Sequence, residues 1–128
     1  MAAIRNTNRS GTTGLVCIGM SNASREFSEF IRLAEADARK NPSLAMVDGA
    51  LEGASATKIA VPGGDYWKHV DRQLQRFEIT AAQVQVVWLK PAQGYETPGF
   101  PEKAWLLQKT LHSIIEILTA KYSQLKLV

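Results

Sequence analysis

The sequence predicts an α/β protein in which a parallel sheet is covered by helices on both faces, a three-layer, flavodoxin-like arrangement. Two observations predict this fold. The chain contains short, almost continuously apolar runs, a pattern typical of strands that are buried on both faces of a sheet. Between these runs, apolar residues recur every three or four positions, as they do on one face of a helix. Such alternation favours parallel strands joined by crossover helices.

Four apolar runs define the predicted strands, which cover residues 15–18, 44–47, 84–89 and 125–128. The last run ends at the final residue, with no helical pattern after it. A buried parallel strand without a following crossover helix leaves an open edge and an uncovered face. We therefore expect the domain to be incomplete at its C-terminus.

The helical patterns lie between the strands and cover 27–38, 67–77 and 104–122. The first helix must end before Pro42, because the residue that precedes a proline is disfavoured in the helical conformation. The third pattern follows Pro101, which is well placed near a first helical turn because no backbone donor is needed there. The predicted order is therefore strand, helix, strand, helix, strand, helix, strand.

The length of 128 residues allows one domain. Residues 1–13 are polar and mildly basic and are expected to form a flexible N-terminal segment, which leaves 14–128 as the domain. The net charge is +3, but the basic residues are dispersed, so we expect no nucleic-acid partner. No apolar stretch approaches the length of about 20 residues that a membrane span needs, so no membrane association is expected.

Cys17 is the only cysteine, so an internal disulfide is excluded, and its apolar neighbours predict a small buried side chain rather than a reactive thiol.

Ligands of open parallel sheets bind at the carboxyl ends of the strands. The loops that leave those ends here are 19–24, 48–57 and 90–99. A functional site should draw on these three loops. No metal or cofactor site is expected.

Ser21 is the first candidate site residue, because it lies in the first loop at the start of the first predicted helix. Free backbone N–H groups and the helix dipole favour developing negative charge at such a position. A serine there can attack an acyl carbon while neighbouring N–H groups hold the oxyanion. Two other interpretations are a helix N-cap, which the loop alone favours, and a bound phosphate or other anion.

The second and third loops offer further candidates. Gly53 can supply a second oxyanion amide, although its glycine can equally serve a turn with positive φ. Asp48 and Glu52 can be read as paired catalytic carboxylates, but their spacing does not favour this over a solvated loop. Lys90 and Gln93 are possible donors in the third loop, or simply polar residues that face water.

The segment Gly19-Met20-Ser21-Asn22 resembles the first conserved block of SGNH hydrolases, also called GDSL-like hydrolases. The stretch 48–57 is similar to their second block, with Gly53 at the position of the oxyanion glycine. The third block, Gly-x-Asn-Asp, is not matched after Leu89. The resemblance implies an SGNH-type fold and an ester hydrolase of acyl or carbohydrate esters, without a cofactor. It implies Ser21 as nucleophile, and the remaining site residues as oxyanion or substrate contacts: Asn22, Gly53, Lys90 and Gln93.

The fourth block of that family, Asp-x-x-His, is absent. His69 and His112 both lie in predicted helices, and we expect them to be far from the strand-end loops. Without a base the serine is a poor nucleophile, so this chain alone is expected to be inactive. The alternative is a non-catalytic binding or interaction domain. A nucleotide-binding domain is disfavoured because no Gly-x-Gly-x-x-Gly motif occurs. Read from Met1 the protein is cytoplasmic, whereas the resemblance implies secretion from a longer N-terminus; the oligomeric state is undetermined.

Overall fold

The computed structural model describes residues 11–95 and 98–128 and contains a parallel sheet of three strands. The strands are β1 (Thr13–Gly19), β2 (Leu44–Asp48) and β3 (Val84–Lys90), in the order β2-β1-β3. Both neighbours of the central strand run parallel to it. The predicted α/β class and parallel sheet are therefore confirmed, in a layout compatible with a flavodoxin-like fold. Residues 1–10 of the expected flexible segment 1–13 lie outside the described residues.

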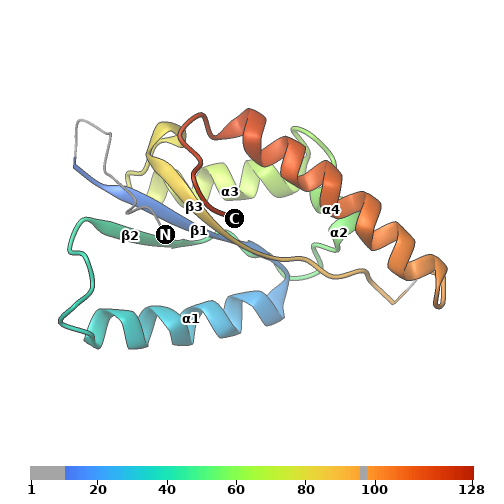
Figure 1. Cartoon of the computed structure of the whole chain (residues 1–128), viewed down its shortest axis with the longest axis horizontal. Coiled ribbons are helices and arrows are strands. Elements are labelled where there is room, and N and C mark those ends of the chain that lie inside the picture. Colours follow the sequence, from blue (N-terminus) through green and yellow to red (C-terminus); the bar gives the residue numbers. More distant parts are fainter. Residues whose placement is uncertain (1–10, 96–97) are drawn as a thin grey trace.

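Four α-helices connect or follow the strands within the described residues (Figure 1). Helix α1 covers one face of the sheet, while α3 and α4 lie on the other, which gives three layers. The predicted helical patterns correspond to three of these helices. The short α2 has no counterpart among them, because four residues are too few to form a recognisable apolar stripe. The bounds are α1 (Ser21–Ala36), α2 (Ala56–Ile59), α3 (Asp65–Arg76) and α4 (Glu102–Lys121), with a 3₁₀ turn at Ala81–Gln83.

The strand β1 divides the apolar core into two parts, because successive side chains of a strand point to opposite faces. Leu15 and Cys17 point toward α1 and form a cluster with Phe27 of that helix. Val16 and Ile18 belong to the larger cluster on the other face. That cluster also contains the buried residues of α3, α4 and the neighbouring loops: Tyr66, Trp67, Val70, Leu74, Ile114, Leu118 and Tyr122.

The run 125–128 forms less of a strand than predicted. It contributes one isolated parallel bridge, between Val86 and Leu127. Its first residue remains in a turn, because the N–H of Leu125 donates to the carbonyl oxygen of Tyr122 at 3.1 Å. The segment therefore begins a fourth strand beside β3 without extending along it.

Two buried polar side chains have no hydrogen-bond partner among the described residues. Both amide atoms of Gln85, on β3, and the hydroxyl of Tyr122, just after α4, are unpartnered. A buried polar group without a partner costs about 1–3 kcal/mol of stability.

No helix in the described part of the chain is both long enough and apolar enough to cross a membrane.

Candidate functional site

The three strands end at one edge of the sheet, so the loops that follow them begin side by side. In the sheet register Cys17 pairs with Asp48, and Gly19 pairs with Lys90. Backbone hydrogen bonds continue this arrangement, because the N–H of Leu51 donates to the carbonyl oxygen of Gly19 at 3.1 Å. The first and second loops, and the first and third, are thus adjacent where they leave the sheet.

Ser21 is the first residue inside α1 rather than its cap. The N-cap is Met20, which is extended (φ −99°, ψ −167°) and makes no side-chain cap hydrogen bond. The interpretation of Ser21 as an N-cap is therefore wrong. Within the described ranges, the N–H groups of Ser21 and Asn22 make no hydrogen bond, and neither does the hydroxyl of the partly exposed Ser21. The side-chain oxygen of exposed Asn22 accepts from the N–H of Ala23 at 2.9 Å.

The hydroxyl of Tyr66 joins the first and second loops from α3. It accepts a hydrogen bond from the N–H of Gly19 at 3.1 Å and donates one to the carbonyl oxygen of Gly49 at 2.8 Å. Tyr66 is buried, and this burial raises its pKa well above the usual value of a tyrosine. The sequence interpretation missed this residue, although it lies beside Trp67 at the start of the predicted apolar stripe.

His69 is closer to the loops than expected. Its Nε2 lies 3.1 Å from the carbonyl oxygen of Ala50, at the carboxyl end of β2. The expectation that both histidines are far from the strand-end loops is therefore wrong for His69. Helix α3 crosses near the end of β2, and this long-range contact has no signal in the sequence. His112 lies on α4 with its Nδ1 3.6 Å from Glu116, and no hydrogen bond of either histidine reaches Ser21 in the described residues.

Asp48 fastens the start of α1 to the second loop. Its carboxylate accepts hydrogen bonds from the Ser24 hydroxyl at 2.5 Å and from the N–H of Ala50 at 2.9 Å. Glu52 is exposed. The carboxylate of Asp48 therefore stabilises the local structure of α1 and the second loop, rather than facing water in a solvated loop.

Gly53 is exposed and adopts a positive φ of 75°, and a Cβ there would meet no atom within 4 Å. The turn therefore explains this glycine. It lines a pocket of about 560 Å³ with Glu52, Lys58 and Tyr66, and Ser21 is not among the described lining residues. A shared oxyanion site of Ser21 and Gly53 stays a prediction.

The two candidates of the third loop are held by neighbouring side chains. Lys90 forms an ion pair with Glu26 of α1. Gln93 is buried, and its amide oxygen accepts from the Thr57 hydroxyl at 2.9 Å while its amide nitrogen donates to the Thr110 hydroxyl at 3.1 Å. Gln93 therefore links α2 to α4. A substrate could recruit either side chain only in exchange for these bonds.

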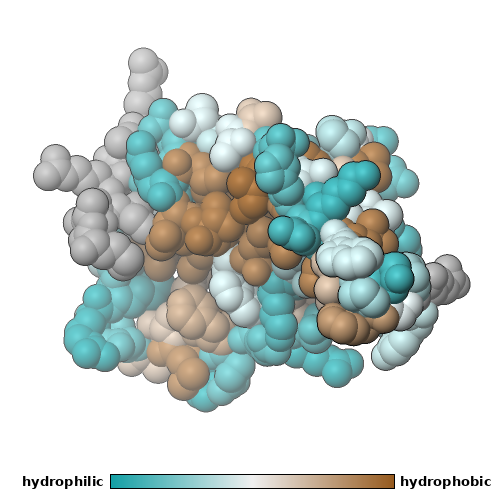
Figure 2. All heavy atoms as spheres, turned by 45° about the vertical axis from the view of Figure 1, so that its right-hand side comes forward, coloured by the Kyte–Doolittle hydropathy of each residue, from teal (hydrophilic) through white to brown (hydrophobic). Residues whose placement is uncertain are grey.

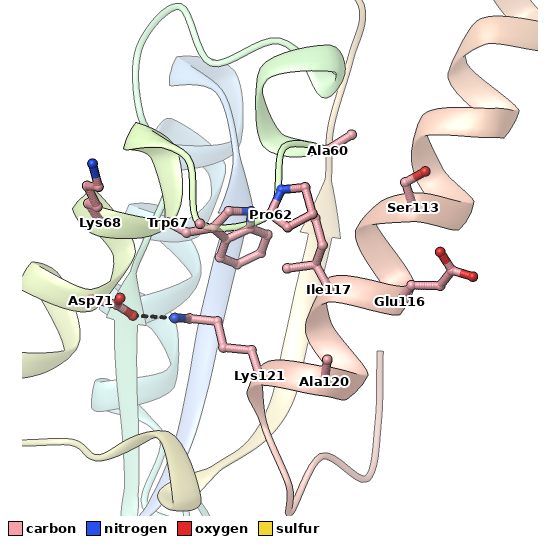
Figure 3. A pocket seen from close by; sticks show the side chains of 11 residues that line it. Ala60, Pro62, Trp67, Lys68, Asp71, Ser113, Glu116, Ile117, Ala120 and Lys121 are labelled. Carbon is pink, nitrogen blue, oxygen red and sulfur yellow. Dashed lines mark ion pairs between the residues drawn. The ribbon is translucent and has the colours of Figure 1, made fainter.

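A larger pocket, of about 710 Å³, lies between α3 and α4 (Figure 3). The buried Trp67 contributes to its floor, and Lys121 forms an ion pair with Asp71 at 2.6 Å. None of the candidate site residues lines it. Its opposite charges neutralise each other, so it offers no net electrostatic attraction to an anion. The ends of the strands remain the candidate site.

Cys17 lies beneath this site, wholly buried on the α1 side of the sheet. Burial, followed by the negative charges of Asp48 and Glu26, raises its pKa to about 12. At pH 8 the thiolate fraction is then about 1 in 10⁴, against about a tenth for a thiol with the ordinary value of 9.0. The thiol is therefore expected to be inert in the folded chain, as the sequence predicts.

We expect a disulfide reagent at pH 8 to modify native Cys17 at least about 1,000-fold more slowly than the urea-unfolded chain, because reaction requires the thiolate. The folded pKa is raised, so the associated stability is complete below pH 9 and declines as the pH rises toward 12. Thiol release measured by absorbance tests the rate, and urea unfolding at pH 8 and pH 10.5 tests the sign. Equal labelling of native and unfolded protein would contradict the burial of this thiol.

No family model, curated protein or solved structure matches the chain. In the described residues, no cluster of three histidine, cysteine or acidic side chains is placed to hold a metal ion. The site is therefore characterised by its own geometry: free N–H groups and a hydroxyl at the start of α1, at the end of the central strand.

Proposed function

We propose that the chain is a serine ester hydrolase-like domain of the SGNH type, which holds the carbonyl oxygen of an acyl or carbohydrate ester at the start of α1. The observation that carries the proposal is that the N–H groups of Ser21 and Asn22 and the Ser21 hydroxyl lack partners among the described residues. An uncapped helix start favours negative charge by about 0.3–1 kcal/mol, and directed N–H groups add to this. Ser21 is the proposed nucleophile.

Turnover by this chain alone should be weak. No histidine of the described residues hydrogen-bonds to Ser21, and the side chains of Lys90 and Gln93 already have partners. A serine without a general base loses most of its reactivity, and triad deletions suggest a rate about 10⁴-fold or more below that of a complete enzyme. The domain is therefore proposed to bind an ester more effectively than to cleave it.

Two measurements on the intact chain test this function. Methylphosphonate mimics the tetrahedral oxyanion, and we expect it to shift the amide NMR signals of Ser21 and Asn22 most strongly. A fluorophosphonate should form a slow adduct that mass spectrometry locates at Ser21. Ser21→Ala should abolish the adduct. Ser28→Ala is the matched control, because Ser28 is on the same helix and its hydroxyl donates to the carbonyl oxygen of Ser24 at 2.8 Å. Phosphonate shifts confined to other residues would contradict the proposal.

The second candidate is a non-catalytic binding or interaction domain. It is favoured by the structural use of Gln93, which occupies the third-loop position where an SGNH-type enzyme needs a free donor. Methylphosphonate shifts at Ser21 without any fluorophosphonate adduct would select this candidate over the hydrolase.

A further inference from the structure

An apolar groove lies between α1 and the β3 side of the sheet. It has a volume of about 510 Å³, within the range of small-molecule sites. Figure 2 shows hydrophobic residues gathered on this part of the surface, which is hollowed above α1. The residues that shape the groove come from α1, β3 and the end of the chain: Phe27, Phe30, Val86, Trp88, Leu127 and Val128.

Aromatic rings form a continuous wall along this groove. The ring of Phe27 stacks on Trp88 with centroids 5.9 Å apart and on Phe30 at 5.8 Å. Phe27 is fully buried, but Phe30 remains 46% exposed and Leu127 41% exposed. The groove therefore has a fixed apolar floor and an accessible rim, which suits a flexible apolar ligand.

The polar end of the groove lies toward the carboxyl ends of the strands, where the proposed ester site is located. Among the described lining residues, Glu26 has the only charged side chain, and it pairs with Lys90 at the carboxyl end of β3. Lys90 in turn is the register partner of Gly19, two residues before Ser21. The rest of the described lining is apolar. This distribution, with side-chain charge at one end only, matches a single-chain amphiphile whose head lies toward Ser21.

We propose that the groove holds the acyl chain of a medium-chain ester, whose carbonyl group lies at the start of α1; this inference rests on the proposed function. The length available to the acyl chain, from the groove to the carboxyl end of the sheet, follows from the register of β1 and β3. The pairs Leu15–Val86 and Gly19–Lys90 are four residues apart, or about 13 Å along a strand. An extended acyl chain of about ten or eleven carbons spans this distance, because carbon–carbon bonds of about 1.5 Å advance a zigzag chain by about 1.3 Å each.

A homologous series of alkylphosphonates tests this proposal on the intact chain. Each compound has the same headgroup as methylphosphonate, so only the length of the alkyl chain changes. We expect the affinity to rise about threefold to fourfold for each methylene, because each buries apolar surface. The rise should stop near ten carbons, where the groove is full. An affinity that is independent of chain length overturns the proposal.

Two matched protein variants test where the alkyl chain of the ligand binds. Phe30→Gln introduces an amide at the rim of the groove, whereas Leu33→Gln makes the same change one turn further along α1, outside the groove lining. Both side chains are about half exposed, at 46% and 55%, so both variants should fold, which circular dichroism checks. Phe30→Gln should weaken decylphosphonate at least tenfold and leave methylphosphonate unchanged. Leu33→Gln should affect neither ligand. Equal effects of the two variants overturn the assignment.

The remaining outcomes separate this inference from the proposed function. Shifts of the Ser21 amide by methylphosphonate, without tighter binding of decylphosphonate, overturn the acyl groove and leave the ester site standing. Decylphosphonate binding that depends on Phe30 but does not shift Ser21 overturns the ester site and, with it, this inference. Sedimentation that shows self-association, abolished by Phe30→Gln and unaffected by decylphosphonate, assigns the groove to a second copy of the chain and overturns the ligand.

Discussion

Gly19→Ala is expected to lower the free energy of unfolding by about 3 kcal/mol, an effect at the upper end of that seen for overpacked sites. A Cβ at this position would lie 2.5 Å from the carbonyl oxygen of Lys90 and 2.6 Å from the Cβ of Ala23. Neither neighbour can move easily, because one is strand backbone and the other is a buried residue in the first turn of α1. Urea denaturation followed by fluorescence measures the loss.

The control for this substitution is Gly99→Ala, where an added Cβ meets no atom within 4 Å and the backbone has no positive φ. That variant should stay within about 0.5 kcal/mol of the parent chain. Equal stability of the two variants would show that α1 does not approach β3 as closely as described. Because Gly19 precedes the proposed ester site, a folded Gly19→Ala protein should also show a displaced Ser21 amide signal.

Tyr66→Phe should cost about 2–4 kcal/mol, because it removes one hydroxyl that serves two buried hydrogen bonds. The N–H of Gly19 loses its acceptor and the carbonyl oxygen of Gly49 loses its donor. A buried backbone group that is left unpaired costs about 1–3 kcal/mol. Thermal and urea unfolding measure the change, and amide exchange at Gly19 should accelerate with it.

Tyr122→Phe is the matched control for this prediction. Both tyrosines are buried, at 3% and 1% exposure, but the Tyr122 hydroxyl has no hydrogen-bond partner in the described residues. Removing it should therefore leave stability unchanged or raise it slightly. A loss at Tyr122 equal to that at Tyr66 would mean that the two hydroxyls are used alike, contrary to the hydrogen bonds described.

Much of the fold could be predicted because its elements have strong local patterns. The apolar runs 15–18, 44–47 and 84–89 lie within β1, β2 and β3, and the three helical stripes correspond to α1, α3 and α4. The run 125–128 forms only one bridge, because its first residue stays in the turn after α4. An apolar run indicates burial, but it does not fix how much of it pairs with a neighbour.

The candidate site was less predictable, because its decisive contacts join residues far apart in the chain. The sequence located the edge of the sheet and the position of Ser21 near a helix start. It gave no sign that Met20 is the N-cap, that Tyr66 fastens two loops, or that His69 reaches the end of β2. These contacts depend on how α3 crosses the sheet, and no local pattern encodes that crossing.

The two faces of the sheet are covered unequally, and this has a consequence for local opening. Of the residues of α1 itself, only Ala23 and Phe27 are buried, whereas α3 and α4 both contribute to the larger apolar cluster on the other face of the sheet. Partial unfolding should therefore proceed by separation of α1 while the opposite layer stays intact. Since Cys17 lies under α1, the rate at which its thiol is modified should report how often α1 separates from the sheet. A ligand that binds against α1 should lower this rate.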